Sequence, residues 1–403
     1  MNRRNVLINL VFCSAMHGLN HYLLIFFKPM YPAMKDYFGL VNIADVTTRM
    51  TILYVGYAIS NFVSGLLSRR LSLRMILFFG MFLMSISTTL IAFVPADSYY
   101  IVVLLVFLMG LGGGTYHPAA NTLITSCYEA KPGHAIGMLS IGAATGFVAA
   151  PFIGEYVGVN LFGFKKLFLL SGLICLLFDF LFLINVRDRR RPVAPKVDYS
   201  KSNSRPLPPG RVLIVSIALM CIPVTIREVV GWSFYEITPF WVKFGFSGGI
   251  AIGWVQSMQY MPGIIVQPLT GKLCDWLGPS AMVIITFIMM GLGITLFVFS
   301  SPIVLWTALI IFGIGACASV VASETYMTTL ANARDRPLVY GVALSVGLGL
   351  GGLLAGVSGW VVDLFGREVV VGYRVWFLSS GGLLILSTLV YLLLTRIRKR
   401  RST

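Results

Sequence analysis

Long apolar stretches alternate with short polar segments along the whole chain. A helix needs roughly 20 apolar residues to cross the hydrocarbon core of a bilayer, and twelve stretches meet that length. The pattern therefore predicts an all-α integral membrane protein with 12 transmembrane helices. The predicted spans cover about 5–31, 49–68, 74–94, 100–126, 134–157, 165–186, 211–242, 250–270, 280–300, 303–330, 338–363 and 374–395.

One long polar stretch divides these spans six and six. Residues 187–210 are rich in Pro, Ser and basic residues, a composition typical of a flexible linker. We therefore expect an N-terminal six-helix bundle over 1–186, a cytoplasmic linker over 187–210, and a C-terminal six-helix bundle with a basic cytoplasmic tail over 211–403. Spans five and eleven also begin with similarly spaced glycines, Gly137 and Gly142 against Gly341 and Gly347. Such duplication is typical of a secondary transporter with its substrate site between the halves.

Composition excludes a soluble fold and sets an orientation. Charged residues make up 11% of the chain, whereas a soluble domain carries about 25%. The net charge of +16 does not indicate a nucleic-acid partner, because the sequence has no soluble basic domain. Instead, 22 of the 31 Lys and Arg fall in the termini, the linker and alternate loops. By the positive-inside rule, this pattern predicts a multi-pass protein of the cytoplasmic (inner) membrane with both termini cytoplasmic.

A loop with two glycines and an acid follows the eighth span. Gly271, Asp275 and Gly278 have the spacing G-x-x-x-D-x-x-G. Glycines permit a tight turn, and an Asp can hold basic residues or a helix N-terminus in one conformation and release them in another. The first half has Gly65 at the corresponding place, but Arg69, which precedes Arg70, stands where the acid belongs, and Ser72 replaces the second glycine.

The fifth span carries Gly137, Gly146, Pro151 and Gly154 at the spacing G-x8-G-x3-A-P-x2-G. Glycines spaced in this way let helices approach closely, and the proline bends the span. This span and the loop above resemble the major facilitator superfamily, in particular its antiporter signature and its cytoplasmic loop signature. The resemblance covers nearly the whole chain and implies a transporter fold and proton antiport. Ordinary helix packing is the alternative explanation of the glycines.

Three further motifs lie in the first, fourth and seventh spans. They comprise His17, Asn20 and His21, then Tyr116, His117 and Pro118, and finally Arg227. This pattern resembles the fosmidomycin-resistance branch of bacterial drug-efflux transporters. The resemblance implies export of a small anionic compound against protons.

Ionisable groups inside a bilayer are costly and usually functional. His17 and His21 are four residues apart and share one helix face, which we expect to line a water-filled cavity. Lys28 continues this face or extends outward to the membrane surface. A cavity histidine can carry protons; an interhelical hydrogen bond is the alternative. The pair also has metal-ligand spacing, but the sequence shows no third ligand, so we expect no metal site.

The fourth span holds His117 between a run of glycines and Pro118. Glycine permits close backbone approach and proline removes a helix hydrogen-bond donor. We therefore expect a local distortion that presents Tyr116 and His117 to the cavity.

The seventh span holds Arg227 and Glu228 near its centre. An arginine stays charged, so Arg227 needs an acid, a carbonyl or an anionic substrate, and its planar donors suit a carboxylate or a phosphonate. A structural ion pair with Glu228 or Glu324 is the alternative. Glu324 lies in the symmetry counterpart of the span bearing His117, which makes it the preferred coupling carboxylate. Asp179 in the sixth span is its competitor.

Two hypotheses follow. The first is a secondary active transporter that exports a small organic solute in exchange for protons by alternating access. The second is an importer or uniporter of an organic anion clamped by Arg227. No nucleotide-binding or nucleophile motif indicates an enzyme, and we expect no cofactor apart from the proton gradient. We expect a monomer whose partners are a small-molecule substrate, protons and membrane lipids.

Overall fold

The computed structural model describes most of the chain, and every element in the described part is helical. The described residues are 3–40, 51–68, 70–128, 130–188, 210–245, 252–299, 301–330, 336–355, 357–365 and 369–399. The predicted linker therefore lies outside the described residues except for Arg187, Asp188 and Gly210.

The first half holds the predicted spans one to six. The fourth span is divided between α6 and α7, and the fifth continues from α8 into a π-helix, η2. The elements are α1 Arg3–Ile25, η1 Lys28–Met30, α2 Tyr31–Tyr37, α4 Ile52–Leu67, α5 Leu73–Ile91, α6 Tyr99–Gly113, α7 Tyr116–Cys127, α8 Pro132–Ile153, η2 Gly154–Leu161 and α9 Phe164–Asn185.

The second half holds spans seven to twelve. Its eighth span is divided between α11 and α12, and its eleventh between α15 and α16. The elements are α10 Gly210–Gly245, α11 Ile252–Tyr260, α12 Gly263–Leu277, α13 Pro279–Thr295, η3 Leu296–Val298, α14 Pro302–Thr328, α15 Arg336–Leu354, α16 Val357–Leu364 and α17 Val370–Lys399.

Ten helical stretches among the described residues are long and apolar enough to cross a membrane. The other two predicted spans correspond to α4, which has 16 residues, and to the short helices α11 and α12 in succession. Backbone polar groups inside hydrocarbon must find partners within the protein, and a helix supplies them. The predicted all-α membrane fold is confirmed, and each of the twelve predicted spans has a helical counterpart.

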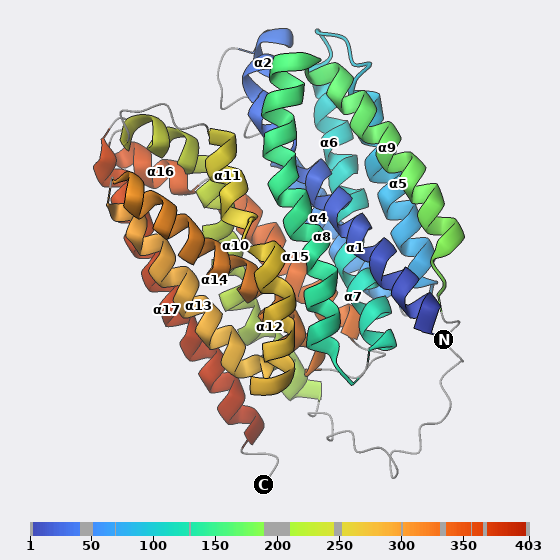
Figure 1. Cartoon of the computed structure of the whole chain (residues 1–403), viewed down its shortest axis with the longest axis vertical. Helices are drawn as coiled ribbons and strands as arrows, with labels where there is room; N and C mark the ends of the chain where they lie inside the picture. Colours follow the sequence, from blue (N-terminus) through green and yellow to red (C-terminus); the bar gives the residue numbers. More distant parts are fainter. Residues whose placement is uncertain are drawn as a thin grey trace.

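Each half has its own cluster of buried apolar side chains. The first cluster is drawn almost entirely from α1 to α9, and the second from α10 to α17. The halves meet mainly where α8 packs on α11 and α12 and where α4 packs on α15 (Figure 1). A Cβ on Gly137 would lie 2.6 Å from the carbonyl oxygen of Gln267, and one on Gly341 would lie 2.9 Å from that of Asn61. Glycine therefore lets the two halves touch through their backbones.

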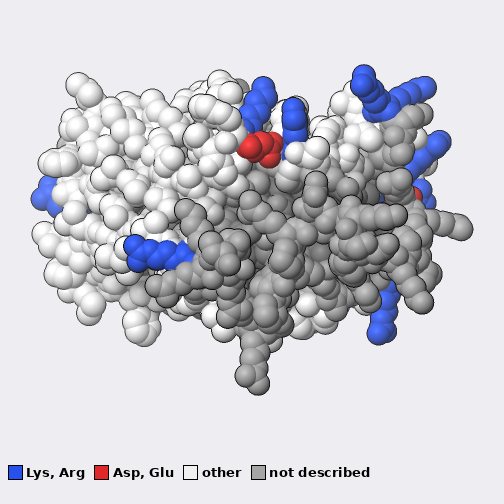
Figure 2. All heavy atoms as spheres, turned by 90° about the horizontal axis from the view of Figure 1, so that it is seen from below, with Lys and Arg blue, Asp and Glu red and all other residues white. Residues whose placement is uncertain are grey.

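The two ends of the chain lie at the same end of the bundle (Figure 1). Seen from below, this end carries Lys and Arg side chains around its rim and fewer acids on the part that is visible (Figure 2). We call it the basic end.

Candidate functional site

Three buried histidines from two helices of the first half lie close together. His17 and His21 are one turn apart on α1, with their Nε2 atoms 3.1 Å apart. The ring of His117, from α7, lies 5.0 Å from that of His17 and 5.6 Å from that of His21. Tyr116 stacks on His17 at 4.5 Å and donates a hydrogen bond to the carbonyl oxygen of Cys13 at 2.7 Å. The fold thus brings together polar residues from two separate sequence motifs.

A break between α6 and α7 positions His117. Pro118 has no N–H to donate, and α6 ends at Gly113 while α7 begins at Tyr116. A Cβ on Gly114 would lie 2.2 Å from the carbonyl oxygen of Tyr57 on α4. Because only glycine permits so close an approach, the glycine run and the proline together produce the local distortion, as predicted.

Glu324 on α14 connects the second half to the histidines. Its Oε1 lies 3.2 Å from His117 Nδ1, and its Oε2 accepts a hydrogen bond of 3.0 Å from Asn121 Nδ2. The residue is 1% exposed, and its backbone oxygen accepts a bond of 3.0 Å from the hydroxyl of Tyr340. We call His117, Asn121 and Glu324 the central junction, since these buried polar groups join α7 of one half to α14 of the other.

Arg227 on α10 is 4% exposed, and its charge is balanced within the protein. Its guanidinium pairs with the carboxylate of the adjacent Glu228 and donates a bond of 3.4 Å to the carbonyl oxygen of Ser319. Glu228 also accepts a bond of 3.0 Å from Trp232 Nε1. The sequence left three partners open for Arg227, namely an acid, a carbonyl or an anionic substrate. The structure shows the acid and the carbonyl.

Lys28 in η1 points toward aromatic rings. Its Nζ lies 5.8, 5.3 and 5.6 Å from the ring centroids of Tyr54, Trp232 and Tyr235, respectively. It also donates a hydrogen bond of 3.2 Å to the Tyr54 hydroxyl. An ammonium group is attracted to such ring faces, so the outward course considered for Lys28 is wrong. Trp232 and Tyr235 belong to the second half, and this contact also connects the halves.

Two further predicted residues have different surroundings. Asn20 donates a bond of 3.0 Å to the carbonyl oxygen of Gly113 and accepts one of 3.4 Å from the Tyr57 hydroxyl, so it holds α1 against α6 and α4. Asp179 on α9 is fully buried, and neither of its carboxyl oxygens has a hydrogen-bond partner among the described residues. The side chain of Glu236, a further acid of α10, lies outside the described part.

Asp275 at the basic end caps a helix of the other half. Its Oδ1 accepts a bond of 3.0 Å from the Gly133 amide, and its Oδ2 accepts one of 2.9 Å from the His134 amide. These amides belong to the first turn of α8, which lacks internal acceptors and carries the positive end of the helix dipole. A Cβ on Gly271 would lie 2.2 Å from the Gly133 oxygen, and Gly278 ends α12 with φ +90°. We call this contact the basic-end latch; its partner is a helix N-terminus.

In the first half, the corresponding segment makes no such link within the described residues. Gly65 lies against α15, where a Cβ on Gly341 would be 3.2 Å from its Cα. Arg70 follows α4, and position 69 lies outside the described residues. The cap of α5 comes instead from Asp188, whose Oδ2 accepts a bond of 2.7 Å from the Leu73 amide. This contact stays within one half.

The small residues of the fifth span pack α8 against its neighbours. Gly137 faces α12, as described above. A Cβ on Gly146 would lie 2.1 Å from the Gly18 oxygen of α1, and one on Gly154 would lie 2.0 Å from the Phe26 oxygen. Pro151 lies inside α8 just before the π-helix begins. These contacts are those of close helix packing, and a role in proton antiport stays a prediction.

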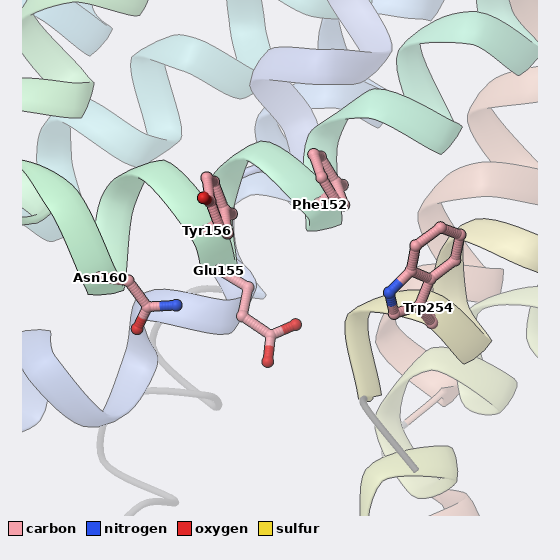
Figure 3. Close-up of a pocket in the computed structure, with 5 residues that line it drawn as sticks. All are labelled: Phe152, Glu155, Tyr156, Asn160 and Trp254. Carbon is pink, nitrogen blue, oxygen red and sulfur yellow. The ribbon is translucent and has the colours of Figure 1, made fainter.

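A cavity of about 180 Å³ lies where η2 meets α11 (Figure 3). A Cβ on Gly253 would lie 2.3 Å from Glu155 Oε2, so this carboxylate reaches the second half. Aromatic rings beside an acid suit the cationic end of an amphipathic molecule. The cavity is lined by Phe152, Glu155, Tyr156, Asn160 and Trp254.

The sequence reasoning missed Asn121 and Asp188. Asn121 follows His117 by four residues and therefore shares its helix face. The spacing argument that paired His17 with His21 would have found it. For Asp188 we see no local signal, because its partner comes from a distant segment.

Comparison with known proteins gives one family. The model of the Major Facilitator Superfamily matches residues 10–250 and again 213–403. Together the two matches span both halves.

The chain is similar to bacterial drug-resistance proteins. It is 27% identical over 289 residues to Multidrug resistance protein MdtG of Proteus mirabilis (strain HI4320), which is 70% of this chain and 68% of that one. It is 30% identical over 201 residues to MdtG of Klebsiella pneumoniae (strain 342), with coverages of 48% and 47%. It is 36% identical over 112 residues to the Multi-drug resistance efflux pump PmrA of Streptococcus pneumoniae (strain ATCC BAA-255 / R6), with coverages of 28% and 27%. The matches to the last two relatives span less than half of those proteins.

Two solved structures share the fold. The human organic anion transporter MFSD10 (TETRAN) superposes with a TM-score of 0.74 at 14% identity, over 97% of this chain and 100% of that one. A bacterial homolog of the human lysosomal transporter Spinster, in an inward-facing and unoccupied conformation, gives a TM-score of 0.66 at 15% identity, over 98% of each chain. At such identities the likeness concerns the fold alone.

Proposed function

The chain belongs to the Major Facilitator Superfamily and is a multi-pass membrane transporter, and on this premise we propose that it exports small organic molecules in exchange for protons. The substrate would bind between the halves and leave by alternating access. We further propose that both termini are cytoplasmic, because 22 of the 31 Lys and Arg fall on that side of the predicted topology.

The central junction is the observation that carries this proposal. Glu324 meets His117 and Asn121 at buried positions from opposite halves. Polar groups at such depth are costly unless they have partners or water. Glu324 is held by His117 and Asn121 while the halves are together, and water or substrate would reach these groups once the halves part. Such groups suit a site that is exposed alternately to the two sides of the membrane.

Export is supported by the relatives. The proteins similar to this chain bear names that describe drug resistance and drug efflux. A binding site for small organic molecules is mostly apolar and aromatic, with a few polar groups. Residues of this kind lie between the halves, namely Lys28, Tyr54, Trp232 and Tyr235.

Asp179 is the acid that we assign to proton coupling. It is fully buried and has no hydrogen-bond partner among the described residues. An ionised carboxylate is expensive in such surroundings, whereas a protonated acid carries no charge. Roles for Glu228 and Glu324 in coupling stay predictions from the sequence.

Two successive experiments test the proposal. Purified protein is first screened by thermal shift against phosphonates, carboxylates, sugars and lipophilic cations, since a ligand of the folded state raises the melting temperature. The compound with the largest shift is then followed in proteoliposomes under an imposed pH gradient.

We expect the gradient to drive substrate accumulation, and Asp179→Asn to abolish this while substrate still raises the melting temperature. The matched control is Asp97→Asn, which changes an exposed acid and should transport normally. Transport that ignores the pH gradient would refute proton coupling. The alternative of an anion importer clamped by Arg227 loses support, because Glu228 already balances that charge. It would gain support if uptake survived Asp179→Asn but not Arg227→Ala.

A further inference from the structure

Three of the four histidines of the chain converge in one buried group. His17, His21 and His117 are 1%, 7% and 5% exposed, respectively. Each offers one ring nitrogen, and these three atoms all lie within 4.8 Å of one another. The sequence had suggested a metal pair on α1 without a third ligand, and the fold supplies the third from α7.

The ring nitrogens of the pair on α1 are separated by a distance that suits one shared ion. His17 Nδ1 faces the carbonyl oxygen of Leu139 at 3.2 Å, which leaves Nε2 toward His21 Nε2 at 3.1 Å. In a tetrahedral zinc site with Zn–N bonds of about 2.0–2.1 Å, neighbouring nitrogens are about 3.3 Å apart. His117 has its Nδ1 at 3.2 Å from the Glu324 carboxylate, so its other nitrogen is the one available to an ion. Metal-bound histidines typically hold their second nitrogen by such a carbonyl or carboxylate.

Within the protein, the contact between His17 and His21 depends on one proton. Their Nε2 atoms lie 3.1 Å apart and attract each other only while one of the two carries a proton, whereas an ion bound to both atoms would replace that proton. Phe147 stacks on the His21 ring at 4.2 Å and holds it in place. His21 Nδ1 is buried without a hydrogen-bond partner in the described part of the chain, and the ion would leave that atom unchanged.

We propose that His17, His21 and His117 bind one divalent transition-metal ion of the zinc class. Imidazole ligands favour zinc and its neighbours, whereas magnesium and calcium prefer oxygen ligands. Three protein ligands leave a fourth position open. The Glu324 carboxylate offsets part of the ion's charge from behind His117, and the open position accepts water or an anionic group of a substrate.

Binding of the ion favours the arrangement seen here, in which His117 of one half contacts Glu324 of the other; we call it the closed arrangement. His117 would contact the metal and Glu324 at the same time, so the ion would fix the ring through which α7 meets α14. We therefore expect Zn²⁺ to slow transport. This last step rests on the proposed transport function, whereas binding of the ion does not.

Zn²⁺ binding to the purified full-length protein tests the site. Titration calorimetry should show one ion per chain, and X-ray absorption should show three nitrogen ligands. His17→Gln and His21→Gln should each abolish stoichiometric binding, and Glu324→Gln should weaken it by about 10-fold or more, as for other partners of metal ligands. The control is His134→Gln, which removes the one histidine outside the group and should bind Zn²⁺ as before.

Separate controls monitor the folding of each variant and its transport activity. Each variant is checked for a monodisperse elution profile and a wild-type-like melting temperature, and Co²⁺ serves as a coloured probe of tetrahedral binding in the unmodified protein. Absence of stoichiometric Zn²⁺ binding, binding that survives in the double variant of His17 and His21, or binding lost with His134→Gln would overturn the proposal. Zn²⁺ binding without slower transport would overturn the link to the closed arrangement. Zn²⁺ binding in a protein that moves no substrate would uphold the site and refute the proposed transport.

Discussion

Removal of the Asp275 carboxylate should open the basic end of the transporter. Asp275 accepts bonds of 3.0 and 2.9 Å from the first two amides of α8 that face it, and α8 belongs to the other half. In Asp275→Ala these amides would bind water instead, which is accessible because the site lies at the end of the bundle.

The expected magnitude follows from the chemistry of helix caps. Replacing a capping Asp by Ala costs about 0.5–2 kcal/mol, and the charge at the helix N-terminus contributes about 0.3–1 kcal/mol of such an effect at an exposed position. We take about 1–2 kcal/mol for the latch, which corresponds to a change of roughly 5–30-fold in an equilibrium constant. The ratio of closed to open molecules at the basic end should fall by that factor.

Distances between labels at the basic ends of α8 and α12 would measure this ratio in detergent or nanodiscs. Asp188→Ala is the matched control, since Asp188 caps α5 with the same chemistry inside one half. We expect it to lower the melting temperature without changing the label distances. If Asp275→Ala left the distance distribution unchanged in a folded protein, or if Asp188→Ala shifted it equally, the latch would not govern opening.

Three further substitutions test the packing and the charges. Gly142→Ala places a Cβ 1.7 Å from a backbone oxygen of α1 and should destabilise the fold by about 1–3 kcal/mol. Gly382→Ala lies inside α17 with open space around it and should keep or raise the denaturation midpoint, because Ala favours a helix over Gly by about 0.5–1 kcal/mol. Arg227→Ala should cost about 3–5 kcal/mol, because it leaves the Glu228 carboxylate without its cation and with only the Trp232 bond. Adding Glu228→Gln should recover much of the loss, and a double-mutant cycle measures the difference. Tyr116→Phe removes one buried hydrogen bond and should cost about 0.5–1.5 kcal/mol in the same assay; no loss would show that water replaces the hydroxyl.

Much of the fold was predictable because the membrane restricts the choice. Apolar lengths near 20 residues can only be helices in hydrocarbon, so the twelve spans followed from the sequence. The shared face of His17 and His21 also followed, since helix geometry fixes their spacing.

Contacts between distant helices were harder to predict. The pairing of His117 with Glu324 was approached only through the symmetry of the two halves, and its geometry depends on how α7 packs against α14. The Arg227–Glu228 pair was one of the alternatives that the sequence left open, and the structure selects it. Adjacent residues leave a helix about 100° apart, yet two long side chains can bend toward each other. The course of Lys28 was left open by the sequence, because its aromatic partners come largely from the other half.

The two sides of the basic-end latch differ in how far they depend on the identity of a side chain. One partner is the Asp275 side chain, whereas the other is the amide of His134 and its neighbour, and every residue except proline provides that amide. Substitutions of the His134 side chain that preserve the helix therefore leave the acceptor's partner in place. Conversely, a lost Asp275 cannot be compensated by reversing charges across the contact, as is possible for two paired side chains. We expect suppressors of Asp275 variants to arise elsewhere in the interface between the halves.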